Sequence, residues 1–428
     1  MCIICFLEDE MQKKMRNIAQ SNNDRFESTL QSYKKDFIFR FNNIKKVDEC
    51  DKHKNLTENV KIWADKLYDS IKNNININDY FEQILSSYLK WVTNDSSKAI
   101  KLMKKCLIQT DYTHQKVPRI KKMLFRTRKS TTLLSREELY HIPFNKRYLV
   151  GNQRYSLSGV PSLYFGLSIP DLISEMRGNY QDLDNYVFSS FLLKQDENLR
   201  IFNFTNQFSA LFSIIDELAR TGGRIDFNDP TLRPNEQDCL YRFYLFILNS
   251  CCSFNRRDKS EGNVFSEEYV LPQLVTQIIS KEDFDGLAFT STRVDNNELY
   301  SKQTFYQDEY KLNYVLFTNY NSNDIYDKQL ISKFNISEPK TINDFQEITL
   351  DDFEVIKKDF VNLQNTRGLF STINDMAEYT GISFDTDFSE VYIKDKDGKE
   401  SKYIETKMGK FHLYLLYSSL IELRNTIA

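Results

Sequence analysis

Residues 154–175, RYSLSGVPSLYFGLSIPDLISE, restrict the fold of this chain more than any other stretch. Gly159 and Pro161 predict a turn, because glycine tolerates positive φ and proline presets a negative φ. Ser162 to Leu167 alternate and carry aromatic residues, which predicts a short strand. A turn followed at once by a strand argues against an all-helical chain.

A helix is expected directly after this strand. Ser168 is a suitable N-cap, and Pro170 suits the first helical turn, where its missing N–H is not needed. Apolar residues then recur at helical spacing, at Ile169, Leu172, Ile173 and Met176. The arrangement predicts that Arg154, Tyr164 and Glu175, from the turn, the strand and the helix, converge on one cleft.

The rest of the chain shows helical patterns before this stretch and short strands after it. Residues 1 to about 115 have helical periodicity, with Thr57 and Asn78 as candidate caps. Cys239–Leu248 is apolar almost all round, which predicts a buried helix. Short strands are predicted over Leu199–Phe204, Phe284–Ser291 and Leu312–Thr318. Strands and helices without regular βαβ alternation indicate an α+β fold.

The last part of the chain has its own pattern. Asp351–Leu363 is helical in pattern, and Phe411–Leu423 predicts a final amphipathic helix. Between them, Val391–Glu405 predicts a hairpin around Asp397-Gly398, a strong turn dipeptide. We expect an accessory extension without chemistry of its own.

Charge and cysteine usage exclude several classes of protein. The net charge of −3 gives no general attraction to nucleic acid or anionic membranes. A basic stretch from Lys98 to Lys129 is interrupted only by Tyr112 and Phe125, which favours a solvated helix face over a nucleic-acid site. No apolar run reaches membrane-spanning length, and MCIICFLEDEM lacks the basic leader of a signal peptide. The seven scattered cysteines predict reduced thiols and a cytoplasmic location.

Few residues offer metal, hydrolase or glycine-rich nucleotide chemistry. Cys2 and Cys5 form a CxxC, but tetrahedral zinc needs four ligands and neither a second CxxC nor a nearby histidine pair follows. Cys50 and His53 are the only remote candidates, so no metal is expected. His141 has no partner for Ser-His or Cys-His catalysis. Neither GxGxxG nor GxxxxGK[ST] occurs, which excludes Rossmann and P-loop sites at the motif level.

Four segments, in the expected order, resemble the RES domain family, named for an Arg, a Glu and a Ser. They are Leu124–Arg128 (LFRTR), Arg154 with Tyr164 and Glu175, Phe265–Gln273 (FSEEYVLPQ) and Phe284–Arg293 (FDGLAFTSTR). The first segment supplies Arg126 and the last supplies Ser291 as the family's serine. Each motif alone is weak, but the ordered set, over roughly residues 118–320, is a fairly specific signal.

The resemblance implies an ADP-ribosyltransferase-like fold, with a split mixed sheet and NAD as substrate in its cleft. It divides the chain into a helical N-terminal domain (1–115), a RES-like catalytic domain (116–335) and an accessory extension (336–428). The catalytic residues that it implies are Glu175, Arg154, Ser291 and Tyr164. The NAD-binding residues that it implies are Arg126, Arg154, Tyr155, Tyr164 and Ser291.

The chemistry implied is cleavage of the nicotinamide–ribose bond through an oxocarbenium-like transition state. Glu175 would lie near the developing positive charge and the ribose hydroxyls. Arg154 and Arg126 would grip the pyrophosphate, since guanidinium gives planar, permanently charged contacts. Tyr164 would pack against nicotinamide or ribose, and Ser291 would hydrogen-bond the carboxamide or ribose. Taken singly, each residue fits an ordinary surface or core role better; as an ordered set they favour an NAD site.

Three functions remain open at this point. The first, which is favoured, is an NAD⁺ glycohydrolase or phosphorylase. It would act as a toxin-like effector that depletes cellular NAD⁺, in a toxin–antitoxin pair or in stress or anti-phage defence, restrained by its helical N-terminal region, with an antitoxin or another regulatory partner. The second is ADP-ribose transfer to a protein. The third is a non-catalytic NAD-binding or interaction protein, whose helical N-terminal region supports self-association.

Overall fold

The computed structural model describes residues 1–114, 123–178, 183–194, 197–208, 236–257, 265–293, 299–301, 311–348, 352, 391–394 and 399–427. The chain forms two compact units. The first comprises residues 1–117, 151–158 and 202–284, and the second comprises residues 118–150, 159–201 and 285–428. Helices dominate the first unit and a sheet dominates the second, which confirms the predicted α+β class. The three domains drawn from the sequence stay a prediction.

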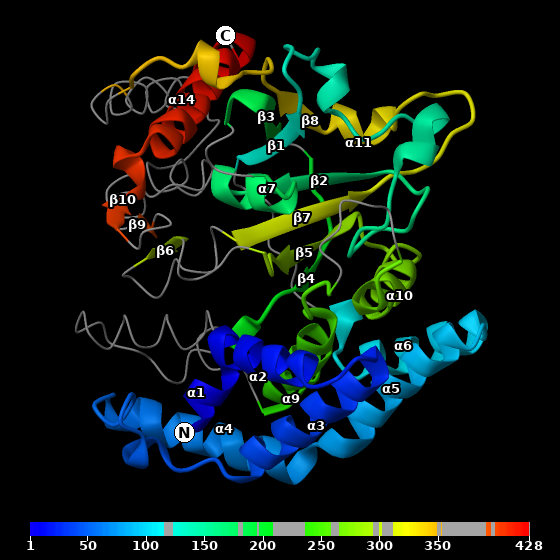
Figure 1. The fold of residues 1–428 in the computed structure, drawn as a ribbon, viewed down its shortest axis with the longest axis vertical. Coiled ribbons are helices and arrows are strands. Elements are labelled where there is room, and N and C mark those ends of the chain that lie inside the picture. The colour runs from blue at the N-terminus through cyan, green and yellow to red at the C-terminus, as the bar shows by residue number, and fades with distance from the viewer. Residues whose placement is uncertain are drawn as a thin grey trace. The chain divides into compact units, whose positions relative to one another are not determined.

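The first unit is helical in its described part (Figure 1). Its helices are α1 (Ile3–Leu7), α2 (Asp9–Ser21), α3 (Phe26–Asn42), α4 (Glu58–Asn74), α5 (Ile77–Val92), α6 (Ser96–Ile108), α9 (Glu236–Cys252) and α10 (Val270–Ile279). Thr57 precedes α4 as predicted, whereas α5 is capped by Asn76 and not by Asn78, because the Asn76 side chain accepts the Asp79 N–H. None of the described helices has the length and apolar character that crossing a membrane requires.

Aromatic side chains fill the core of the first unit. The ring of Phe37 meets those of Phe6 and Phe81 edge-on, with centroids 4.8 and 5.1 Å apart. Such edge-to-face contacts add to the stabilisation that burial gives. The predicted buried helix over Cys239–Leu248 is confirmed as part of α9, in which Phe243 and Phe246 are buried. The short helix α1 thus contributes Phe6 to this core.

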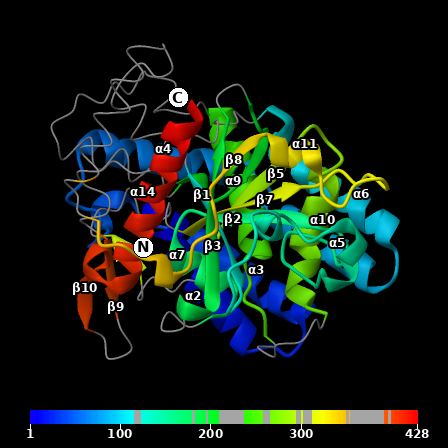
Figure 2. The ribbon, with the colours of Figure 1, turned by 90° about the horizontal axis from the view of Figure 1, so that it is seen from above.

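A seven-stranded sheet carries the rest of the fold. Its order is β4 (Ile201–Phe204), β5 (Gly286–Thr290), β7 (Leu312–Phe317), β2 (Ser162–Gly166), β1 (Leu124–Lys129), β3 (Tyr186–Leu193) and β8 (Phe334–Ile336). Five neighbouring pairs, from β5–β7 to β3–β8, are antiparallel, and Figure 2 shows β2 beside β7. All eight residues of β3 are buried. Burial on both faces is expected of a central strand that is covered on both sides.

Two helices pack on this sheet within the second unit. They are α7 (Ile169–Glu175), which follows β2 directly, and α14 (Lys407–Ile427), which contacts β3 and α7 (Figure 1). Phe188 of β3 meets Phe411 of α14 with ring centroids 5.5 Å apart. Ile169 and Ile173 of α7 belong to the same buried cluster. The sheet and α14 therefore hold α7 in a fixed place.

Several elements agree with the sequence, and others fall outside the described residues. The strand and helix predicted over residues 162–176 are confirmed as β2 and α7. The predicted hairpin is represented by the antiparallel pair β9 (Val391–Lys394) and β10 (Glu400–Lys402). β6 (Leu299–Ser301) pairs with β9, and α11 (Lys328–Ser332) precedes β8. The turn Asp397-Gly398 and nearly all of the helix predicted over Asp351–Leu363 lie outside the described residues.

Candidate functional site

Helix α7 places two carboxylates one turn apart in the second unit. The helix begins where the Ser168 side chain accepts the Asp171 N–H, and Pro170 occupies its first turn. Asp171 and Glu175 are separated by four residues, which puts both on the same face of the helix. Glu175 is the last residue of α7, with its side chain about one third exposed (31%).

Ser291 reaches Glu175 from a distant part of the chain. The serine follows β5 directly, and its backbone N–H donates to the Lys311 carbonyl at 2.8 Å, which extends the pairing with β7. Its hydroxyl donates to Oε1 of Glu175 at 2.7 Å, although 116 residues separate the two in sequence. The structure therefore brings together Glu175 and Ser291, two of the residues singled out in the sequence.

Arg293 holds the other side of the same carboxylate. Its Nε lies 3.4 Å from Oε2 of Glu175, and its Nη1 donates to the Glu175 backbone carbonyl at 2.8 Å. The Arg293 N–H also donates to the Ser291 hydroxyl at 3.2 Å. A carboxylate with a hydroxyl on one oxygen and a guanidinium beside the other is held in one orientation.

Asp171 lies beneath this arrangement and is fully buried. Burial raises its pKa well above the ordinary range, and the nearby Glu175 charge raises the pKa further. Ser291 and Asn313 lie close enough to oppose this shift, but neither Asp171 oxygen has a partner in hydrogen-bond geometry. Burial without a hydrogen-bond partner therefore favours the neutral form of the Asp171 carboxyl.

Arg126 and Tyr164 contact one another, but through the backbone of Tyr164. Arg126 of β1 donates to the Tyr164 carbonyl at 2.9 Å and to the Tyr140 carbonyl at 3.2 Å. Arg128, two residues along the strand, also donates to Tyr140 at 2.8 Å. Burial lowers the pKa of Arg126 to about 9, with Arg128 as the second cause, so the guanidinium stays charged at pH 7. In the described residues, neither arginine has a carboxylate within ion-pair distance.

Arg154 and Tyr155 belong to the first unit, whereas the other predicted site residues belong to the second. Arg154 donates to the carbonyls of Cys252 and Phe254 at 2.6 and 2.8 Å, and its guanidinium lies over the Tyr269 ring. Tyr155 is buried. The sequence segment with Tyr269 also supplies Gln273, which donates to the Gln153 and Ser156 carbonyls. Arg154 and the segment with Tyr269 thus meet in the first unit, whereas Tyr164 and Glu175, from the same resembling segment as Arg154, belong to the second.

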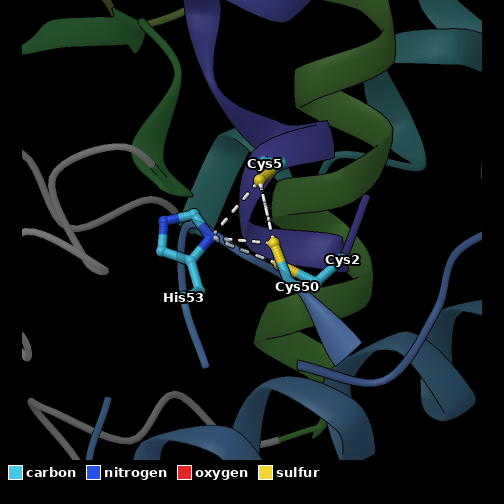
Figure 3. Close-up of side chains that lie close together, drawn as sticks. All are labelled: Cys2, Cys5, Cys50 and His53. Atoms are coloured by element: carbon cyan, nitrogen blue, oxygen red, sulfur yellow. Dashed lines mark hydrogen bonds between the residues drawn. The ribbon is translucent and has the colours of Figure 1, made fainter. Parts of the chain in front are cut away.

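A different cluster, of metal-ligand type, lies in the first unit. The Sγ atoms of Cys2, Cys5 and Cys50 and Nδ1 of His53 lie within 4.8 Å of one another (Figure 3). Cys2 caps α1 and Cys5 lies on it, while Cys50 and His53 share a turn closed by the His53 N–H and the Cys50 carbonyl. This buried group can hold a metal such as zinc.

The same contacts shift the proton affinities within this cluster. Hydrogen bonding with Cys2 raises the pKa of Cys5 to about 12, and the same contact lowers the pKa of Cys2. Burial opposes the charged form of His53, but Cys5, Cys50 and Glu8 together outweigh it, so the pKa of His53 is raised. Cysteine and histidine side chains must lose their protons to bind a metal ion. A single cation in this cluster would take the place of the protons that these side chains now share.

The sequence argument against a metal site is corrected by this geometry. It required a second CxxC, whereas the fold supplies a CxxH, from Cys50 to His53. In both CxxC and CxxH, two residues separate the two zinc ligands. This shared spacing is the sequence signal that could have predicted the cluster. In the second unit, Asp171 and Arg293 were also missed. Asp171 lies four residues before Glu175, and Arg293 lies two residues after Ser291, so both are close in sequence to residues that were predicted.

Comparison with known proteins finds one distant relative. The chain is 27% identical over 234 residues to a protein of Bacillus subtilis (strain 168) named "Putative toxin YopC". The match covers 53% of this chain and 48% of the relative, so the chain spans about half the length of that protein. No family model matches the chain, and no solved structure does.

Proposed function

We propose that the chain is an NAD⁺-degrading enzyme of toxin type, and that Glu175 is its central catalytic residue. The observation that carries the proposal is the hydrogen bond from Ser291 to Glu175, because it joins two resembling segments that lie far apart in sequence. Similarity to a protein whose name includes the word toxin supports the biological role. The proposed restraint by an antitoxin or another regulatory partner goes with that role.

The proposed reaction breaks the bond between the ribose C1′ and the nicotinamide nitrogen. The electron pair of this bond goes to nicotinamide, which leaves neutral and needs no general acid. The ribose passes through an oxocarbenium-like state with positive charge near C1′. Water then forms the new C1′–O bond and loses a proton, giving ADP-ribose; phosphate in its place gives a phosphorylated product.

Glu175 would stabilise the positive charge that develops on the ribose. Preorganised charge of this kind is usually the largest contribution to catalysis, because it needs no rearrangement during the reaction. Ser291 and Arg293 hold the carboxylate from both sides, which supports such preorganisation. The raised pKa of Asp171 disfavours a second negative charge beside Glu175.

Arg126 and Arg128 would bind the phosphates of the substrate. Both guanidinium groups are partly buried on one strand, and they donate to carbonyl oxygens, not to carboxylates. Guanidinium groups without an acidic partner are well suited to phosphate oxygens, which they contact in planar, charge-assisted pairs.

Expression in a bacterial host tests the proposal. Wild-type protein is expected to stop growth and to lower cellular NAD⁺, measured by mass spectrometry, whereas Glu175→Gln at equal protein level leaves both unchanged. Glu58→Gln, an exposed acid on α4, is the matched control and should behave as wild type. Equal toxicity of wild type and Glu175→Gln would refute the assignment. Free ADP-ribose, its phosphate ester or labelled polypeptides among the products identify water, phosphate or protein as the acceptor.

A further inference from the structure

We propose that Cys2, Cys5, Cys50 and His53 form a closed structural zinc site that fastens helix α1 to the turn at residues 50–54. The site is separate from the chemistry proposed for Glu175 and does not depend on it. Its four donors come from two short segments, CxxC and CxxH, that lie 45 residues apart. The inference rests on distances, burial and donor type.

The donor distances match the edges of a zinc tetrahedron. Zinc–sulfur bonds of about 2.3 Å and a zinc–nitrogen bond of about 2.0–2.1 Å give edges of about 3.8 Å between sulfurs and about 3.6 Å from sulfur to nitrogen. The sulfurs of Cys2 and Cys5 are 4.0 Å apart, and those of Cys5 and Cys50 are 3.6 Å apart. Nδ1 of His53 lies 3.3, 3.3 and 3.8 Å from the sulfurs of Cys2, Cys5 and Cys50. The remaining pair, the sulfurs of Cys2 and Cys50, lies within 4.8 Å, so one ion at the centre would bond all four atoms once these two sulfurs close on it (Figure 3).

The donor set selects zinc and argues against other occupants. Three thiolates and one imidazole suit zinc, whereas Mg²⁺ and Ca²⁺ prefer oxygen ligands. All four coordination positions are supplied by the chain, so no position stays open for a water or a substrate, which is the mark of a structural site. Disulfides do not explain the cluster, because the 3.6 and 4.0 Å sulfur separations far exceed a bond of about 2.05 Å.

The surroundings of His53 complete the arrangement. Nδ1 faces the three sulfurs, and Nε2 on the other side of the ring lies 3.7 Å from Oε1 of Glu8. A carboxylate on the far nitrogen of a zinc-bound histidine fixes the ring and its tautomer. Lys52 donates to the same Glu8 oxygen at 2.6 Å, so Glu8 is itself held. Glu8 is a positioning residue, since it acts on the metal through His53.

The cluster explains how α1 can persist. A helix of five residues is not stable by itself, and α1 has no side-chain cap at its start. Two of the four ligands belong to α1 and its cap, and the other two to a turn held by backbone bonds to the Cys50 carbonyl. A metal bond between these segments holds α1 in the position in which Phe6 enters the aromatic core.

Metal analysis of the purified full chain tests the proposal. We expect about one zinc ion per wild-type chain, and Co²⁺ in its place should give the thiolate charge-transfer and tetrahedral ligand-field bands of a sulfur-rich site. Cys50→Ala should lose stoichiometric zinc, whereas His53→Cys should retain it because it completes a Cys₄ site. Cys106→Ala, a buried cysteine on α6, is the matched control and should bind as wild type.

Further results separate this proposal from its alternatives. Glu8→Gln should weaken zinc binding roughly 10- to 100-fold, measured by competition with a chromogenic chelator, with the site still formed. Wild-type protein that binds no Zn²⁺ or Co²⁺ after reduction would overturn the proposal. So would Cys50→Ala protein with full zinc content, or an octahedral Co²⁺ spectrum.

Discussion

The Glu175 carboxylate accepts a hydrogen bond from Ser291 at 2.7 Å and lies 3.4 Å from the guanidinium of Arg293. Both contacts are made before any substrate binds, so the side chain has its orientation in advance. Asp171, one helical turn earlier, is buried, and burial raises its pKa. At the scale of residues, the second unit therefore offers one oriented negative charge beside a buried acid.

Ser291→Ala tests the value of this orientation. The change removes the hydroxyl that donates to Oε1 of Glu175. A hydrogen bond to a charged group contributes about 1.5–3 kcal/mol, so nicotinamide release should slow roughly 10- to 100-fold. Turnover should fall while the thermal midpoint changes little, and Ser21→Ala, an exposed serine on α2, should leave both unchanged. A Ser291→Ala enzyme with wild-type turnover would show that the hydroxyl does not position Glu175.

Asp171→Asn tests the protonation of the buried acid. Because the folded chain raises the pKa of Asp171, it binds a proton that the unfolded chain releases above its ordinary pKa of about 3.9. The free energy of unfolding therefore falls as pH rises through this range toward the raised pKa. Asn carries no such proton, so Asp171→Asn should flatten the decline between about pH 5 and pH 8.

Urea unfolding at several pH values measures this difference. Asp184→Asn, an exposed aspartate in the same unit, should keep the wild-type pH dependence. Parallel pH profiles for wild type and Asp171→Asn would mean that Asp171 is ionised in the folded protein.

At the scale of elements, two short helices depend on different partners. Helix α7 is held by its Ser168 cap and by packing against the sheet and α14. Helix α1 has no side-chain cap and carries two of the four ligands of the proposed zinc site, one of them its N-cap Cys2. Packing secures the first, whereas metal coordination is expected to secure the second.

Hydrogen exchange measures this dependence for α1. Adding a zinc chelator should speed exchange of the amides of residues 3–7, which include the Phe6 N–H bonded to the Cys2 carbonyl. Amides of α5 should keep their protection, because that helix has its own side-chain cap and a buried face. Unchanged α1 exchange after complete zinc removal would show that the metal does not fasten the helix.

The elements also show what a single sequence can and cannot predict. The strand β2 and the helix α7 were predicted because a turn, an alternating run and a cap are all local signals. The start of α5 was misplaced at Asn78, because several asparagines compete there and only the fold selects Asn76. The ligand cluster could not be predicted, because the path from Cys5 to Cys50 depends on how α2 and α3 pack.

At the scale of the whole molecule, the resembling segments are divided between two units. Arg154 and Tyr269 meet in the first unit. Arg126, Tyr164, Glu175 and Ser291 belong to the second. The order of the motifs along the chain predicted which segments belong to the candidate site. The number of residues between the motifs does not tell which of them fold into the same unit. The distant relative, of which the match covers 48%, includes toxin in its name.

Nicotinamide release from NAD⁺ by the purified chain tests the central claim most directly. The account predicts steady release by the wild type and by Glu58→Gln. It predicts loss of about 10³-fold or more for Glu175→Gln, as removal of a main electrostatic stabiliser costs. Release by Glu175→Gln at the wild-type rate, or no release by wild-type protein with its zinc bound, would contradict the account.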